Sequence, residues 1–361
     1  MSVIVDCYPT DRPNDVAGLE RFLGNLPLDQ IERLALLGKT EGTATINDFS
    51  RELAVGAAET TIIKFGGVEL LSRSTLIFST GCEGIISPSV YVLATLKDEE
   101  ISAGGSLQLA MGGAQTRIMV AEELATDIQV GLVATAVELA LKEASLRPDQ
   151  ASLVLVKSPI LTPNEAALTA DPAVIARAGI SGLSRGAAAL GVAVALGELE
   201  IKTLEDINIG KDFHQYATRA MTFSGTEVKH CEILVLGNRQ GANGTSRIYS
   251  RQLNDILDTR SLKALFCEAG CNLDEIGELA GKEILQAVML KVGIAPDGHV
   301  RGERTTVYQS EVDADKHMRA SASGVIGSLL GTGRIFVSGG TEHQAPPGGG
   351  ICACIVGTKA Q

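Results

Sequence analysis

Three serines of this chain stand in the same local pattern. Each one ends an apolar run, is followed by one or two small residues that include glycine, and is closely followed by a glutamate. An apolar, β-rich run that ends in serine and glycine places the hydroxyl at the tip of a strand, where backbone N–H groups can be left free and point the same way. The pattern occurs at 77–83, 221–227 and 336–342, with the serines Ser79, Ser224 and Ser338.

A lysine and an arginine precede each serine in the same order. The lysine ends a predicted strand and the arginine lies near the start of a predicted helix; they are 28 residues apart in two sets and 12 in the first. Successive lysines are 118 and 134 residues apart, which is too long for a solenoid repeat and long enough for a domain. We therefore expect three similar domains in a pseudo-threefold arrangement. The sets are Lys39, Arg51 and Ser79; Lys157, Arg185 and Ser224; and Lys291, Arg319 and Ser338.

Serine, lysine and arginine together are suited to acyl chemistry. A serine beside a lysine can act as nucleophile and general base when the lysine is neutral. Burial and a nearby positive charge both lower the pKa of a lysine, and the arginine of each set supplies such a charge. An arginine at a helix start also favours an anionic or carbonyl-rich ligand. Because the backbone N–H after the serine is a natural oxyanion donor, the sets predict acyl transfer from an amide.

Each residue of a set also has an ordinary structural explanation. A lysine at a strand end is commonly solvated, an arginine in a first helical turn commonly lies on the surface, and serine beside glycine is usual in turns. Three copies in one order are hard to obtain from independent coincidences, so we favour the functional interpretation. An alternative within it is common ancestry with function retained in only one copy.

The hydrophobic pattern predicts an α/β (α+β) fold in three units, 1–103, 107–247 and 252–361. Polar, glycine-rich linkers are expected at 98–106 and 237–245. The expected strands are 34–37, 74–78, 90–96, 107–111, 153–156, 220–223, 233–236, 287–290, 335–337 and 351–356. The expected helices are 14–24, one starting near 48, 121–144, 186–196, 273–285 and one headed by Arg319.

Composition narrows the class of protein. The chain has 361 residues, 45% of them hydrophobic, which supplies enough apolar surface for real cores. Its formal charge of -12 and the absence of a basic run argue against a nucleic-acid partner. No apolar stretch reaches the length of a membrane span and no signal peptide is recognised, so a cytoplasmic protein is expected. The seven scattered cysteines are expected to be reduced and mostly buried.

Several local matches to known motifs are rejected because the surrounding residues do not fit the motif. The sequence 38–40 resembles the end of a phosphate-binding loop, but that loop needs glycine at the position of Arg33. The sequence 182–186 matches a nucleophile elbow, yet helix and turn rather than a strand precede it. The pair Cys267 and Cys271 has no matching pair for zinc, and the five histidines show no metal spacing.

With the three sets placed, the chain closely resembles the ring-opening amidohydrolases, the family that includes cyanuric acid hydrolases and barbiturase. The similarity covers essentially the whole chain and rests on 38–42 with 47–51, on 184–186, and on 337–340 continuing into 342–344. The resemblance implies three repeats around a pseudo-threefold axis in a prism-like, Toblerone-shaped fold. It places the active site on that axis and implies a homotetramer.

The resemblance also implies a role for each set. Ser224 is the nucleophile and Lys157 the base that activates it, while Lys39 and Lys291, with their serines, hold the other two edges of the substrate ring. Family members open cyanuric acid to carboxybiuret, which loses carbon dioxide to give biuret, in s-triazine degradation. The implied substrate-binding residues are Arg51, Ser79, Thr80, Arg185, Ser224, Gly225, Arg319, Ser338 and Gly339.

The loop after the third serine matches a family metal site in part. Proline and glycine leave its backbone carbonyls exposed, which suits a hard cation such as Mg²⁺ or Ca²⁺, or equally a rigid turn. A glutamate ligand is expected two residues after Lys291, where this chain has Gly293. That departure leaves open whether a structural cation binds, and no organic cofactor is expected. The implied ligands are Thr341, Gln344, Ala345, Pro346 and Gly349.

Three alternatives for function differ in what they require. Cyanuric acid has three equivalent edges, whereas barbituric acid would leave a buried polar group unpaired at one edge, at a cost of about 1 to 3 kcal/mol. This favours cyanuric acid over barbituric acid. A non-catalytic binder of cyclic imides does not need a lysine of lowered pKa beside Ser224. A scaffold protein would expose an apolar face instead of repeated polar residues.

Overall fold

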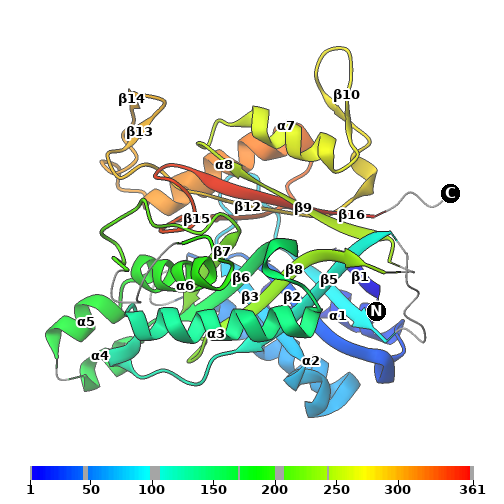
Figure 1. The fold of residues 1–361 in the computed structure, drawn as a ribbon, viewed down its shortest axis with the longest axis horizontal. Coiled ribbons are helices and arrows are strands. Elements are labelled where there is room, and N and C mark those ends of the chain that lie inside the picture. Colours follow the sequence, from blue (N-terminus) through cyan, green and yellow to red (C-terminus); the bar gives the residue numbers. More distant parts are fainter. Residues whose placement is uncertain are drawn as a thin grey trace.

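Three mixed sheets with one topology make up the chain (Figure 1). The computed structural model describes residues 2–43, 48–97, 106–169, 171–199, 207–241 and 244–357. In each repeat the first strand pairs antiparallel with the last, the last antiparallel with the second, and the second parallel with the third. The strand orders are β1-β4-β2-β3, β5-β8-β6-β7 and β9-β16-β12-β15. This confirms the mixed α/β fold of three repeats.

The strands of each sheet come from one third of the chain. The first sheet holds β1 (Ser2–Pro9), β2 (Ile31–Thr40), β3 (Ser74–Thr80) and β4 (Ser89–Leu96). The second holds β5 (Leu107–Gln115), β6 (Ala151–Pro159), β7 (Ala220–Gly225) and β8 (Glu232–Gln240). The third holds β9 (Ser246–Leu253), β12 (Leu285–Val292), β15 (Phe336–Gly339) and β16 (Gly350–Gly357).

Helices connect the strands and cover the outer face of each sheet. The principal ones are α1 (Ala17–Gly24), α2 (Ser50–Ser72), α3 (Asp127–Ala144), α6 (Ser181–Ala195), α7 (Thr259–Glu268) and α8 (Ala314–Leu330). Two shorter helices, α4 (Pro163–Leu168) and α5 (Pro172–Ala178), precede α6. The third repeat adds two small hairpins, β10 (Asn272–Leu273) with β11 (Leu279–Ala280) and β13 (His299–Val300) with β14 (Glu303–Arg304).

Strand alternation divides the core into an inner and an outer part. In β2, Ala35 and Leu37 belong to a central cluster that all three sheets share, while Leu34 and Leu36 pack outward beneath α1 and α2. The other two sheets alternate in the same way. Because successive side chains of a strand point to opposite faces, every second residue of each sheet faces the common axis. The three inner faces thus form the prism that the resemblance implied.

One predicted helix, 273–285, is wrong. The helix of that region is α7, and 272–280 form the β10–β11 hairpin. The Asp274 carboxylate accepts hydrogen bonds from the backbone N–H groups of Ile276 and Glu278, and Gly277 takes a positive φ of 80°. An aspartate that bonds its own local backbone in this way competes with the helix.

The unit boundaries also need adjustment. The strand β9 runs across the position where the third unit was expected to begin, residue 252, so the third repeat starts at Ser246. The strand β8 occupies 237–240, which were expected to be linker. The predicted linker at 98–106 lies almost entirely outside the described residues. The sequence pattern also gave no sign of β1 or β9, the first strands of their sheets.

No single helix of the described chain is long and apolar enough to span a membrane. Among the described helices, only α5 and α6 taken together have the length and apolar composition of a span, and they are bent by 71°. Most of α6 is buried against its own repeat.

Candidate active site

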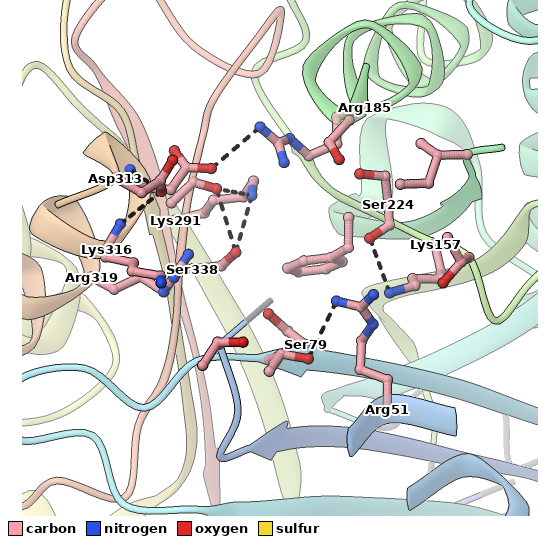
Figure 2. A pocket seen from close by; sticks show the side chains of 18 of the residues that line it. Arg51, Ser79, Lys157, Arg185, Ser224, Lys291, Asp313, Lys316, Arg319 and Ser338 are labelled. Carbon is pink, nitrogen blue, oxygen red and sulfur yellow. Dashed lines mark hydrogen bonds and ion pairs between the residues drawn. The ribbon is translucent and has the colours of Figure 1, made fainter. Parts of the chain in front are cut away.

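A polar cavity of about 450 Å³ opens where the three repeats meet. Residues of all three repeats line it, and Figure 2 shows side chains from the separate repeats pointing into one space. Lys39 and Gly225 are not part of the lining, and Lys39 lies behind Ser79. The predicted residues that line the cavity are Arg51, Ser79, Thr80, Lys157, Arg185, Ser224, Lys291, Arg319, Ser338 and Gly339.

The three lysines reach the axis because of strand alternation. Each follows, at intervals of two, inward-facing apolar residues of the same strand: Lys39 continues the face of Ala35 and Leu37, for example. The same holds for Lys157 in β6 and Lys291 in β12. All three lysines are 1% exposed or less. The ends of the parallel strand pairs therefore bring the Lys157 and Lys291 amines to the cavity wall and place the Lys39 amine against Ser79, which lines the cavity.

Burial lowers the pKa of all three lysines. Loss of solvent is the main cause for each, because it penalises the charged amine. The pKa of Lys39 falls to about 7, with the Arg319 guanidinium adding to the effect. The pKa of Lys157 falls to about 8, where burial and Arg51 outweigh the opposing charge of Glu227. Burial and the Arg185 guanidinium hold the pKa of Lys291 well below its ordinary value.

Two of the lysines contact the hydroxyl of the serine in their own set. The Lys39 amine lies 3.3 Å from Ser79 Oγ and the Lys291 amine lies 3.2 Å from Ser338 Oγ. Each also donates to the backbone carbonyl of the residue after the serine. These pairs follow from strand register, because Lys39 is directly opposite Ser79 and Lys291 directly opposite Ser338.

The third lysine makes a different set of contacts. Lys157 is opposite Phe223, and its amine donates to the backbone carbonyls of Ser224 at 3.3 Å and Phe78 at 3.0 Å. It also forms an ion pair of 2.5 Å with Glu227. In the described part of the chain, Ser224 Oγ is buried without a hydrogen-bond partner. The structure thus places Lys157 against the carbonyl of Ser224 and leaves the hydroxyl free.

Arg51 reaches the cavity from the first turn of α2, and Arg185 and Arg319 reach it from the second turns of α6 and α8. Asp313 caps α8 by accepting from the backbone N–H groups of Asp315 and Lys316, and this fixes the start of the helix that carries Arg319. Asp315 in turn lies 3.5 Å from Arg185 of the second repeat. The third repeat therefore contributes acidic residues to the cavity wall that the sequence analysis did not single out.

Three glutamates, which we call the clamp glutamates, hold the arginines from the neighbouring repeat. Arg51 contacts Glu227 at 3.1 Å, Arg185 contacts Glu342 at 2.7 Å and Arg319 contacts Glu83 at 2.5 Å. Each pair joins one repeat to the next, so the three pairs close a ring around the cavity. Paired, partly buried guanidinium groups are fixed in orientation. The glutamate of each serine pattern was visible in the sequence, but its partner on another repeat was not.

The loop proposed for a cation is closed by its own hydrogen bonds. The carbonyl of Gly349 accepts from the backbone N–H of Gly293 and from the hydroxyl of Thr341, at 3.0 and 3.1 Å. The Gln344 side-chain oxygen accepts from the backbone of Thr222 at 2.7 Å. A Cβ at Gly293 would lie 2.1 Å from Thr341 Oγ1, so a glutamate there would require the Thr341 side chain to move. The Gly349 carbonyl and the Gln344 side-chain oxygen are thus engaged by protein hydrogen bonds.

Other metal positions are absent from the described ranges, where no cluster of three histidine, cysteine or acidic residues could hold an ion. All seven cysteines are free thiols, and four of them are buried. Cys267 is exposed and Cys271 buried, so this pair does not point to a common ligand.

Comparison with known proteins agrees with this geometry. The model of the amidohydrolase ring-opening protein family matches residues 5–357. A cyanuric acid amidohydrolase of Bradyrhizobium diazoefficiens is 36% identical, over 96% of this chain and 95% of the relative. A cyclic amide hydrolase of Azorhizobium caulinodans is 34% identical over 99% of this chain and 100% of the relative.

Solved structures agree as well. A cyanuric acid hydrolase structure described in terms of structural concatenation superposes with a TM-score of 0.88 and 29% identity, over 99% of both chains. The cyanuric acid hydrolase of A. caulinodans superposes with a TM-score of 0.87 and 32% identity, also over 99% of both chains. From its three repeats, its axial cavity and these matches, the chain belongs to the ring-opening amidohydrolase family, whose members are cyclic amide hydrolases.

Proposed function

We propose that this enzyme hydrolyses the ring of cyanuric acid. One observation carries the proposal: an arginine and a serine from each of three repeats converge on a single cavity of about 450 Å³. A ring with three equivalent carbonyl and N–H edges has the same symmetry as that arrangement. The relatives named cyanuric acid amidohydrolase, which match nearly the whole chain, support the same substrate.

We further propose that Ser224 is the nucleophile and Lys157 its base. The Ser224 hydroxyl is free of hydrogen bonds in the described chain, whereas the hydroxyls of Ser79 and Ser338 are bonded to their lysines. A rotation of the Ser224 side chain brings its hydroxyl toward the Lys157 amine, which already contacts the carbonyl of the same residue. A free hydroxyl beside a lysine of lowered pKa meets the requirement for an activated serine.

The proposed reaction has two half-reactions. Ser224 Oγ bonds to a ring carbonyl carbon while neutral Lys157 takes the hydroxyl proton, and the carbonyl electron pair moves to the oxygen. The arginines and the backbone N–H after Ser224 stabilise this oxyanion. Its collapse breaks the ring C–N bond, and the leaving nitrogen takes the proton from Lys157. Water then hydrolyses the acyl-enzyme to carboxybiuret, which loses carbon dioxide to give biuret.

Barbituric acid is the second candidate, and one observation favours it. The second repeat departs from the other two in the contacts of its lysine, so one edge of the cavity differs from the other two. Barbituric acid likewise has one edge that differs, because carbon replaces a ring nitrogen. Its hydrolysis would give ureidomalonate by the same nucleophile and base.

Turnover of the two rings by the purified enzyme, measured side by side, tests the proposal. Loss of ring absorbance is followed together with biuret or ureidomalonate formation. The proposal expects cyanuric acid to be opened with the higher kcat/KM. Turnover of barbituric acid alone would show that barbituric acid, and not cyanuric acid, is the substrate. Binding of either ring without turnover would contradict the proposed reaction. The family resemblance also predicts a homotetramer, which light scattering on the same preparation checks.

A further inference from the structure

The three serine patterns differ in the interval between the serine and its clamp glutamate. The clamp glutamate is the fourth residue after the serine in the first and third repeats, as Glu83 follows Ser79 and Glu342 follows Ser338. In the second repeat Glu227 is the third residue after Ser224. The strand register shows the same difference, because Lys157 is opposite Phe223 instead of the serine. Phe223 belongs to the central core, so it takes the inward place that the serine holds in the other two repeats.

This shorter connection changes what the clamp glutamate can reach. Glu83 and Glu342 each bind both nitrogens of an arginine fork, Nε and Nη2, with both carboxylate oxygens. Glu227 contacts Arg51 through Nε alone, and the Arg51 Nη1 group is bonded to Thr80 Oγ1 at 3.3 Å. Glu227 therefore keeps capacity for Lys157, which it contacts at 2.5 Å.

The other two lysines have no such partner. Within the described residues, no carboxylate forms an ion pair with Lys39 or Lys291. Their amines donate to serine hydroxyls and backbone carbonyls and lie over the rings of Phe336 and Phe223. The Glu227 side chain is also the least exposed of the clamp glutamates, with 3% of its surface exposed against 21% for Glu83 and 30% for Glu342. A carboxylate in contact with a buried amine stabilises the protonated form of that amine.

We propose that Glu227 is the positioning residue that singles out the second repeat for catalysis, by holding Lys157 and stabilising its protonated form. The proposal rests on the function proposed above and deepens it. In the reactive state the Lys157 amine is neutral, and it takes the Ser224 proton as the new C–O bond forms. Glu227 stabilises the ammonium that results. Lys157 then passes that proton to the leaving nitrogen and is neutral again.

Charged groups around Lys157 fix the sign of the expected pH effect. Glu227 and Glu52 stabilise its protonated form, and Arg51 opposes it. Glu227→Gln removes the closest negative charge, so the Lys157 amine loses its proton at lower pH than in the wild type. The acidic limb of the kcat profile must then move to lower pH. A merely structural role for Glu227 would lower activity without moving that limb.

The experiment compares Glu227→Gln with Glu83→Gln and Glu342→Gln over a range of pH. The first variant is expected to lose at least about 10²-fold in kcat and to shift its acidic limb downward, because the ammonium formed on Lys157 loses its stabilising charge. The two matched variants loosen arginines that bind substrate, so they are expected to raise KM several-fold and keep the wild-type limb. Glu138→Gln changes an exposed residue of α3 and serves as the control for the effects of a Glu-to-Gln substitution away from the cavity.

Glu227→Asp keeps the charge and supplies a second test if the glutamine variant folds poorly. It is expected to recover part of kcat and to restore the wild-type limb. Equal losses and unmoved limbs in all three glutamine variants would overturn the inference while leaving the proposed function intact. A wild-type enzyme that opens neither ring would overturn the proposed function, and the inference with it.

Discussion

The second repeat and the first use the same residues for different purposes. In the first repeat the buried lysine bonds directly to the serine hydroxyl, with Lys39 3.3 Å from Ser79 Oγ. In the second, the lysine bonds to a glutamate and to the serine carbonyl, and the hydroxyl is free. A one-residue change in a turn separates the two arrangements. Repetition builds a threefold binding surface, and a small local departure from it can supply one reactive position.

Removal of the serines gives the largest expected contrast between repeats. Ser224→Ala is expected to lower kcat by about 10⁴-fold or more, because it removes the nucleophile. Ser79→Ala and Ser338→Ala remove only hydrogen bonds to the ring, and we expect losses of about 10- to 100-fold, mostly in KM. Steady-state kinetics on the three variants measures this, and calorimetry checks that Ser224→Ala still binds substrate. Near-normal turnover by Ser224→Ala would place the nucleophile in another repeat.

The pH dependence of kcat tests whether Lys157 acts as the general base. A general base must be neutral, and the pKa of Lys157 is lowered by burial to about 8. Below that pH the amine is protonated, so kcat is expected to fall about tenfold per pH unit and to level off above it. Initial rates at saturating substrate, from pH 5.5 to 9.5, give the profile. A kcat that is flat across this range would exclude a titrating amine as the base.

Replacement of Lys39 or Lys157 by methionine tests the difference between the first and second repeats through the free energy of unfolding. Lys39 has no carboxylate partner in the described residues, and burial lowers its pKa to about 7, so the folded state loses stability relative to the unfolded state as pH falls from 10.5 toward 7. Lys39→Met is expected to raise the free energy of unfolding by about 1 to 3 kcal/mol at pH 7. The increase in the free energy of unfolding should be largest below pH 7 and should decrease as the pH rises toward 10.5.

Lys157→Met is expected to act in the opposite direction. It leaves the buried Glu227 with Arg51 as its remaining cationic partner, and we expect a loss of about 1 to 3 kcal/mol at the same pH. Urea unfolding of both variants at pH 7 and pH 9.5 measures the contrast. Equal changes in both proteins would show that the Glu227 contact contributes nothing to the state of Lys157.

The smallest expected effect concerns the C-terminal loop of the third repeat. Because Thr341 Oγ1 fills the space beside Gly293 and the loop oxygens already accept protein hydrogen bonds, we propose that the loop needs no cation. EDTA, and separately excess Mg²⁺ or Ca²⁺, should shift the melting temperature by no more than about 1 °C, since a ligand that does not bind the folded state cannot stabilise it. A stabilisation that follows metal concentration would show that a cation binds.

Sequence reasoning found the residues of the site because they recur in order. Strand ends and helix starts are local features, so the positions of Lys157 and Arg51 could be predicted from apolar runs and turn residues. The ring of clamp glutamates could not, since each pair spans two repeats and depends on how the sheets pack. The different contact of Lys157 had a signal in the sequence, the shorter interval from Ser224 to Glu227, but its meaning needed the strand register.

The fold shows the same division. Strands with strong apolar runs, such as β6 and β16, were predicted closely, whereas β9 was missed because its polar residues hide the alternation. The false helix at 273–285 came from a periodicity that the local hydrogen bonds of Asp274 override.

The most direct test of the account is the identity of the serine that carries the acyl group. The enzyme is mixed with cyanuric acid, quenched in acid within milliseconds, digested and analysed by mass spectrometry for a peptide heavier by the whole ring. We predict that the adduct is on the peptide that contains Ser224 and is absent from those that contain Ser79 and Ser338. An adduct on either of those two peptides would contradict the assignment of the second repeat as the catalytic one.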